Sequence, residues 1–427
     1  PRVDSSYLYA ILSYKCKYFP WAGSDLFHVT TAEGDRQMVI VETNSCPSGQ
    51  KSMPPLNEHD DMGGYKVLME HVFLPYMKKR NLPKGAIAVV YDKNEMETSG
   101  YAAALADLLN EPVYLVPFFA NDENPPVRFT DGVMEIQDEQ GKWVPVKVAF
   151  RYVTQKPWNR IPIHTKTLVL NPILSCLAGG RNKLIASKAY EIFNAEIADS
   201  GLQIKTPETI RDVEKTEIPL WVKKFGGYAV IKIPYSNAGQ GVFTITSEKE
   251  LEEFMEHDYP YNQFIVQSLI GNYEWSSIQE KGRFYHIGTV PNKKSEIYIA
   301  DLRMMVGSGP TGFKPIAIYS RKSRIPLQEQ LTGKIASWDM LGTNLSIKNI
   351  DGTFESDTSR LLLMDRKDFN IQGLNIDDLI DAYIQTVLSV ISIDKMAANL
   401  LNQKGRFRKK LFQSLNNDDA LLNELVI

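Results

Sequence analysis

Apolar residues recur along the chain with two different periods, which divide its first part into helices and strands. Apolar and aromatic residues at helical spacing predict helices over residues 5–18 and 63–79. Short apolar runs predict strands over residues 25–29 and 37–42, joined by a turn at 32–35. The chain is therefore expected to open with a helix and an antiparallel pair of strands.

A strand–helix–strand unit follows. Residues 86–91 and 112–117 are predicted strands, and residues 99–109 are the predicted helix between them. This order is typical of a doubly wound parallel sheet. A glycine-turned hairpin around 130–141 and a strand over 147–153 continue the unit, so the pattern predicts an α/β fold.

The second half of the chain contains a compact α+β segment. After a predicted helix over 182–198, residues 228–267 have the order strand, loop, strand, helix, strand. Ser247 is expected to cap this helix, with Glu250 completing a capping box. A segment of this size can form a mobile lid.

The remaining pattern predicts antiparallel strands and then helices. Strands are expected to continue to about residue 321, and the weak pattern over 328–369 favours no single element. Helices are predicted over 377–401 and 404–415.

Composition limits the classes of function. A chain of 427 residues is expected to form two or three domains. With a net charge of −3, the chain has no excess positive charge to attract nucleic acid or an anionic membrane, so neither is an expected partner. No run of about 18 apolar residues occurs, which argues against a membrane-spanning helix.

The chain start and the cysteines indicate context. The opening Pro1-Arg-Val-Asp has neither Met nor an apolar signal segment, which indicates a trimmed chain or fragment. Cys16, Cys46 and Cys176 have no metal spacing and no disulfide pattern, which favours buried thiols in a reducing cytoplasm.

An early strand carries oxygen ligands. In Val41-Glu-Thr-Asn44, Glu42 and Asn44 lie two residues apart and so point to one face of the strand. Such a pair suits Mg²⁺ shared with nucleotide phosphates, and Asp25 on the neighbouring strand can join it. The alternative is that these residues are exposed polar side chains in the turn that ends the strand.

A later strand carries a phosphate-binding signal. Lys232 ends an apolar strand, where a buried ammonium needs an anionic partner. The loop after it ends in Gly239, Gln240 and Gly241, and its backbone N–H groups can lie against phosphates. Lys183, at the start of a helix, can meet the same phosphates. Either lysine can instead be a solvated or snorkelling side chain.

The strand that leaves the lid offers main-chain contacts for an adenine, expected around Gln267 and Leu269. Glu274, just beyond it, can accept hydrogen bonds from ribose hydroxyls.

Arginines follow on the last strands. Asp301 and Arg303 share one face of a strand, and Arg321 ends the next one. Arginine clamps a carboxylate, an acyl phosphate or a γ-phosphate with two parallel hydrogen bonds. Asn344 belongs to a further polar group nearby in the sequence. A cross-strand Asp–Arg pair on a solvated face is the alternative.

Together these segments resemble the ATP-grasp superfamily, in particular circularly permuted and pre-ATP-grasp ligases with the glutathione synthetase architecture or with peptide or carrier-protein substrates. The family's Glu-x-Asn metal strand is similar to Val41-Glu-Thr-Asn44, with Asp25 as the preceding aspartate. Its lid lysine falls on Lys232, its helix-opening lysine on Lys183, and its buried strand arginine on Arg151.

The resemblance implies a division into three parts. A pre-ATP-grasp domain is expected over 1–165, with the permuted metal-binding strand at 37–44. An ATP-grasp domain is expected over 166–360, with its lid at about 200–268. Residues 361–427 are expected to add C-terminal helices.

The resemblance also implies ATP- and Mg²⁺-dependent formation of an amide or peptide bond through an acyl phosphate. The expected partners are a small carboxylate and an amine, either of them an amino acid or peptide, with a carrier protein also open. Arg303 and Arg321 are expected to hold the reacting carboxylate, and Arg151 a second anionic group. The sequence carries no signal for oligomeric state.

Two other functions remain open. One is an ATP-dependent phosphotransferase with no amine acceptor. The other is a non-catalytic nucleotide-binding or scaffold protein, suggested because Ser268 and Ser236 stand where the family often has acidic residues.

Overall fold

The central antiparallel sheet is built from strands near the start of the chain and strands some 270 residues later. In this computed structural model, β1 (Trp21–Thr30) pairs with β2 (Arg36–Asn44) and with β15 (Ile297–Gly309). β15 in turn pairs with β16 (Gly312–Lys322). Three short strands extend this sheet: β13 (Tyr285–His286), β14 (Thr289–Pro291) and β19 (Leu361–Leu362).

The structure describes residues 3–49, 63–78, 81–154, 156–236, 239, 241–280, 282–331, 335–348, 354–362, 364 and 366–425. Within these ranges, every helix is too short or too polar to span a bilayer.

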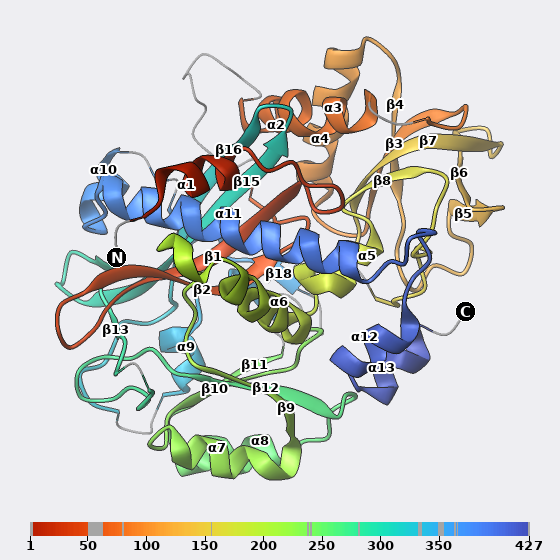
Figure 1. The fold of residues 1–427 in the computed structure, drawn as a ribbon. Coiled ribbons are helices and arrows are strands. Elements are labelled where there is room, and N and C mark those ends of the chain that lie inside the picture. Colours follow the sequence, from red (N-terminus) through yellow and green to blue (C-terminus); the bar gives the residue numbers. More distant parts are fainter. Residues whose placement is uncertain are drawn as a thin grey trace.

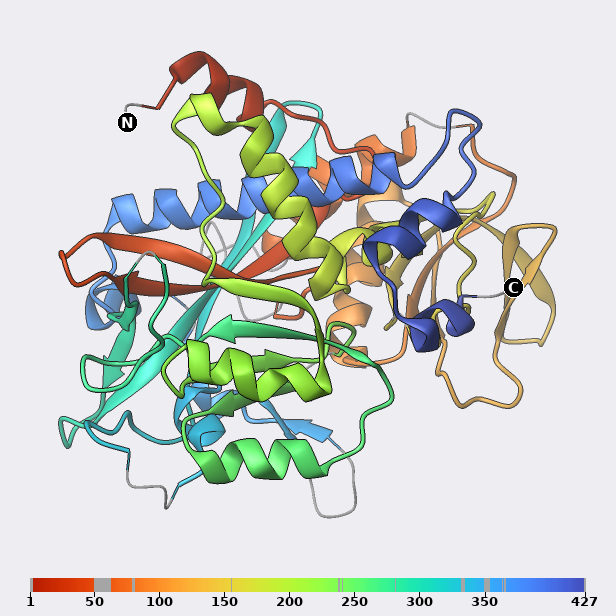
Figure 2. The ribbon, with the colours of Figure 1, turned by 60° about the horizontal axis from the view of Figure 1, so that its bottom comes forward.

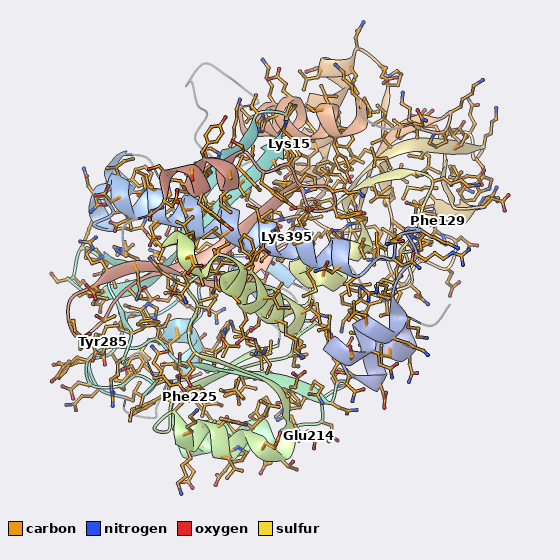
Figure 3. All side chains as sticks on the ribbon, viewed as in Figure 1. Lys15, Phe129, Glu214, Phe225, Tyr285 and Lys395 are labelled. Carbon is orange, nitrogen blue, oxygen red and sulfur yellow. The ribbon has the colours of Figure 1, made fainter. Side chains whose placement is uncertain are left out.

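The long helix α11 (Ile376–Asn399) lies across one face of the central sheet (Figure 1). The helix contacts β1, β2 and β15 on one side and α6 (Lys183–Glu196) and η3 (Cys176–Gly180) on another, so an unbroken run from Gln385 to Asp394 is buried. Lys395, labelled in Figure 3, forms an ion pair with Glu196 at the end of α6. The helix thus closes this face, and the other face is left for the site.

A second sheet confirms the predicted doubly wound unit. Its parallel core has the order β4-β3-β7-β8, and α4 (Glu95–Leu109) connects β3 to β4. The strands and the helices near them are β3 (Ala86–Tyr91), β4 (Val113–Pro117), β5 (Val127–Thr130), β6 (Val133–Gln137), β7 (Trp143–Tyr152), β8 (Leu168–Leu170), α2 (Gly63–Leu68), η2 (Met69–Phe73) and α3 (Leu74–Lys78).

The predicted lid is a separate four-stranded antiparallel sheet of order β11-β10-β12-β9. Figure 2 shows two helices on the far side of this sheet from the central one. Its elements are β9 (Thr209–Glu214), α7 (Ile218–Lys224), β10 (Ala229–Lys232), β11 (Val242–Ile245), α8 (Glu248–Glu256) and β12 (Gln263–Ser268). Ser247 caps α8 as predicted, but the Glu250 carboxylate accepts from the Thr246 N–H instead of closing a capping box.

Several boundaries differ from the predicted ones. The first helix, α1 (Ser5–Leu12), is shorter than expected, and the segment with the weak pattern forms short elements. The other elements are α5 (Ile173–Ser175), η3 (Cys176–Gly180), η4 (Ala198–Ser200), η5 (Lys215–Glu217), α9 (Ser337–Leu341), β17 (Ser346–Lys348), β18 (Phe354–Ser356), η6 (Thr358–Arg360), α10 (Arg366–Ile371), α12 (Lys409–Leu415) and α13 (Asp419–Glu424).

The sheet topology bears on the predicted domains without fixing their limits. Residues 21–44 pair with 297–309 in the central sheet, whereas residues 86–170 form the second sheet. The boundaries at 165 and 360 therefore stay a prediction.

Candidate active site

A row of four polar side chains crosses the central sheet. Glu42 on β2 pairs in register with Asp25 on β1, Asp25 with Arg303 on β15, and Arg303 with Tyr319 on β16. Directly paired residues share a face of the sheet. Asn44, two residues after Glu42, lies on the same side. The register therefore brings the expected carboxylates and arginines together.

Buried ion pairs hold the arginines. Arg303 donates to both oxygens of Asp25, with Nε–Oδ1 at 2.6 Å and Nη2–Oδ2 at 2.8 Å. Arg321 lies 3.0 Å from Asp25 Oδ2 and donates through Nε to Asp301 Oδ1 at 3.1 Å. Burial alone would raise the pKa of the Asp25 carboxyl, but the two guanidiniums outweigh it and hold that pKa well below its usual range.

Asp25 thus has a different partner from the expected one. Both its oxygens are engaged by guanidinium groups, which leaves this carboxylate poorly placed as a metal ligand. Its geometry is that of a residue that positions Arg303 and Arg321. The Nη1 nitrogen of Arg321 makes no hydrogen bond within the described part of the chain and is free for a ligand.

Glu42 and Asn44 offer a small set of oxygen donors. Glu42 Oε1 lies 3.2 Å from Lys183 Nζ, and Asn44 Oδ1 accepts from Arg181 at 3.3 Å. Within the described ranges, no three histidine, cysteine, aspartate or glutamate side chains form a group that could hold a metal ion. The donors fit a Mg²⁺ that takes one or two protein oxygens and completes its shell with phosphates and water.

Two lysines approach Glu42 from different elements. Asn182 caps α6 by accepting from the Ile185 N–H, which fixes Lys183 in the first turn. Lys183 Nζ donates to Ser236 O at 2.6 Å, and Lys232 Nζ donates to Val41 O at 3.0 Å. Both lysines thus lie close to Glu42, and Lys183 also contacts the loop that follows Lys232.

The ammonium of Lys232 is buried. The residue is only 6% exposed, and burial is the main cause that lowers its pKa to about 8. The neighbouring Glu42 carboxylate acts in the opposite direction, and Lys183 adds to the lowering. Its protonated form therefore gains from an added anion.

These groups line a cavity of about 910 Å³ between the central sheet, the lid and the second sheet. Most of the predicted site residues line it: Asp25, Glu42, Asn44, Lys183, Lys232, Gly239, Gln267, Leu269, Asp301, Arg303, Arg321 and Asn344.

Known proteins give structural matches only. No family model and no curated protein matches this chain. A RimK domain ATP-grasp protein from Sphaerobacter thermophilus is similar over 72% of this chain and 99% of its own, at 14% identity and TM-score 0.35. A glutathione synthetase-like effector from Globodera pallida is similar over 71% and 73%, at 10% identity and TM-score 0.41.

D-alanyl-alanine synthetase A from Vibrio cholerae is also similar, over 72% of this chain and all of its own, at 10% identity and TM-score 0.36. The Sphaerobacter thermophilus protein is described as an ATP-grasp protein.

Three predicted residues lie outside the cavity lining. Arg151 is buried and donates to Asn171 O and Val153 O at 2.6 Å each, so its guanidinium ties backbone together and faces no ligand space. Glu274 is exposed away from the cavity, so the structure does not bring it to a ribose site. Gly241 closes the loop after Lys232, because its carbonyl accepts a hydrogen bond from the Ile233 N–H at 2.7 Å. Gln240 lies outside the described residues.

The predicted adenine contact differs in detail. The Leu269 N–H donates to Ser277 Oγ at 2.6 Å, and the Leu269 carbonyl accepts from the Ser277 N–H at 3.0 Å. The Gln267 side chain donates to Thr209 Oγ1 at 2.8 Å. The main-chain donor expected for adenine is thus already engaged, while Phe27 and Leu341 give this end of the cavity apolar walls.

Sequence reasoning missed some lining residues: Ser48, Lys93, Lys156, Arg181 and Tyr319. Lys93 had a usable signal, since it follows the parallel strand β3 at its carboxyl end, where α/β sheets place ligands. Lys156 had the same signal, because it follows the parallel strand β7. Ser48, Arg181 and Tyr319 are brought to the cavity only by tertiary packing.

Proposed function

We propose that this protein is an ATP-dependent carboxylate–amine ligase that forms an amide or peptide bond through an acyl phosphate. The observation that carries the proposal is one cavity lined by two lysines, the Glu42–Asn44 oxygen pair and two arginines held by buried aspartates. This is the set of charges that a polyphosphate and a reacting carboxylate require side by side.

At the phosphate end, Lys183 and Lys232 neutralise the triphosphate, and the loop around Gly239 lies along it. Gly239 has a φ of 75°, and a side chain there would meet Asn344 and Trp338, so glycine is favoured at this point. Glu42 and Asn44 would hold Mg²⁺, which would supply positive charge to neutralise the polyphosphate.

At the reaction end, Arg321 and Arg303 orient the substrate carboxylate. A carboxylate oxygen attacks the γ-phosphorus and the bond to the β-phosphate oxygen breaks, which gives an acyl phosphate and ADP. The amine nitrogen then attacks the acyl carbon, inorganic phosphate leaves, and the amine releases a proton to solvent. Little covalent chemistry is asked of the protein beyond alignment and charge.

The lid supports this chemistry by excluding water. Acyl phosphates hydrolyse when exposed, so the cavity must close while one is present. The lid sheet supplies Lys232, Gly239 and Gln267 to the lining, so closure and phosphate binding are one event.

The proposal predicts that ADP release requires Mg²⁺, an acid and an amine together. The purified chain is screened against amino-acid and peptide pairs, with ADP coupled to an optical assay and the product identified by mass. Lys232→Met should lower the rate at least about 100-fold, while Lys249→Met on the exposed face of α8 should leave it unchanged. Release with the acid alone would instead indicate a phosphotransferase.

A nucleotide-binding protein without turnover is the second candidate. It is favoured by the engaged Leu269 N–H and by the aspartates that already occupy Arg303 and much of Arg321. Saturable ATP binding with no ADP from any acid–amine pair would support it and contradict the ligase.

A further inference from the structure

The cavity continues past the row of charges to the second sheet. At this end it is lined by the turn that follows β2 and by residues just beyond the carboxyl ends of β3 and β7. The lining residues here include Pro47, Ser48, Lys93, Asn94, Thr154 and Lys156. The carboxyl ends of parallel strands are where α/β sheets place ligands.

Ser48 joins this end to the reaction centre. Its carbonyl accepts from Arg303 Nη1 at 3.3 Å and from the Tyr319 hydroxyl at 2.6 Å. Its hydroxyl accepts from Asn94 Nδ2 at 3.0 Å and donates to the Tyr152 hydroxyl oxygen at 2.8 Å. Ser48 therefore contacts both Arg303 and Asn94, the residue after Lys93. We infer that a small substrate can reach from Arg303 to Lys93.

Two lysines at this end of the cavity form no ion pair with the described residues. Lys93 forms no ion pair within the described ranges; its ammonium lies 5.5 Å from the centre of the Tyr152 ring. Lys156 likewise lies over the Tyr261 ring at 4.4 Å, without a carboxylate at contact distance among the described residues. Arg181 adds a third cation to the lining.

The acidic groups nearby are engaged elsewhere. Asp92 pairs with Arg160 at 2.8 Å and accepts from the Thr154 N–H. Glu97 accepts from the Gly49 N–H and from the Tyr152 hydroxyl, each at 3.0 Å. Neither carboxylate contacts the Lys93 ammonium.

The pKa of Lys93 agrees with this count of charges. Burial is the main cause that lowers it to about 8, and Arg181 adds to the lowering. The opposing effects of Asp92 and Glu97 are too small to offset these two. An anion bound beside Lys93 would restore the stability of its charged form.

We propose that the acid substrate carries a second anionic group, a carboxylate or a phosphate, which Lys93 binds together with Arg181 and Lys156 while the reacting carboxylate lies at Arg303. This inference rests on the proposed ligase function. It moves the role expected for Arg151 to Lys93, because Arg151 faces only protein atoms and Lys93 faces the cavity.

The direct test is chemical protection of Lys93. The full chain, with ADP and Mg²⁺, is acetylated by an N-hydroxysuccinimide ester, and the rate at each lysine is measured by mass spectrometry. The probes are glutarate and 3-phosphonopropanoate, each with two anionic groups, and glutaramate with one, all at about 10 mM. Lys249 serves as the exposed reference lysine.

At least one dianionic probe should slow acetylation of Lys93 about 5-fold or more, and glutaramate should slow it less than about 2-fold. The better of the two dianionic probes identifies the second group as carboxylate or phosphate. Equal acetylation of Lys93 under all conditions, or equal protection by glutaramate, would overturn the inference.

A turnover measurement separates this inference from the ligase proposal. Matched acids, glutamate with glutamine and aspartate with asparagine, are compared as acid substrates. Lys93→Gln should lower kcat/KM for the charged member about 10- to 100-fold and leave its neutral partner unaffected. Equal turnover of both members by the unaltered chain would refute the second anion site but keep the ligase. Protection of Lys93 without any ADP release would keep the second anion site and refute the ligase.

Discussion

Lys232 shows how the burial of a single charged side chain can favour the binding of an anion. Burying an ammonium without a carboxylate in contact costs several kcal/mol. Its hydrogen bond to Val41 O and the nearby Glu42 recover only part of that cost, as the lowered pKa shows. A polyphosphate in the cavity would supply the missing charge.

The pKa of Lys232 predicts a pH dependence of ATP affinity. Phosphate favours the charged ammonium, so affinity should fall as pH rises through about 8. Between about pH 7 and about pH 9.5 we expect a loss of about 10-fold, measured by calorimetry. In Lys232→Arg, whose guanidinium stays charged, the affinity should change less than about 2-fold over the same range.

The same residue gives a stability control. Because its pKa is lowered from 10.5 to about 8, the unfolded chain binds more protons than the folded one in that window. Its contribution to the free energy of unfolding therefore rises with pH there. The Lys232→Met variant should fold, and its Tm at pH 7 should equal or exceed that of the unaltered chain. Its free energy of unfolding should no longer rise with pH in this window. A collapsed Tm would show that weaker ATP binding is only misfolding.

The individual site residues were predictable where chemistry and sequence neighbours agree. Glu42 and Asn44 stand two apart on one strand, and Lys232 precedes a glycine loop, so each is visible locally. Lys93 belongs to no local motif, and only its position after the carboxyl end of β3 indicates that it faces a ligand site.

Among the secondary-structure elements, α11 has a second task besides covering the sheet. The buried carboxylate of Asp394 accepts from the backbone N–H groups of Lys17, Tyr18 and Phe19 and from the Tyr14 hydroxyl. These residues form the turn that leads into β1. Asp394 thus sets the position of the strand that carries Asp25.

Replacing this carboxylate should destabilise the chain. In Asp394→Asn an amide nitrogen would face backbone donors, so we expect a loss of about 2–4 kcal/mol in the free energy of unfolding, measured with urea. The control Asp377→Asn, exposed in the first turn of the same helix, should cost less than about 1 kcal/mol. Similar values for both variants would contradict the role assigned to Asp394.

The elements predicted best are those with a long regular pattern. The helices at 376–399 and 183–196 and the parallel strands lie close to their predicted limits. The failures are short. The described residues between 337 and 362 form short helices and strands of two to five residues, which are too short for a period to develop.

On the scale of the molecule, the arrangement depends on pairings that no local pattern encodes. β1 meets β15 across about 270 residues of chain, and this pairing places Asp25 against Arg303. The parallel sheet was predictable because its strand–helix–strand order is local. The meeting of the central sheet, the lid and the second sheet around one cavity follows only from tertiary packing.

The shared cavity implies that the Glu42 strand and the Lys232 strand contact one triphosphate. Calorimetric titration with AMPPNP, with and without Mg²⁺, measures this for the unaltered chain, Glu42→Gln, Lys232→Met and the reference Lys249→Met. Lys232→Met should weaken binding about 10-fold or more in both conditions. Glu42→Gln should remove the gain that Mg²⁺ gives and leave metal-free binding unchanged or tighter. If both variants bind AMPPNP as the unaltered chain does, with and without Mg²⁺, the nucleotide does not bind in this cavity.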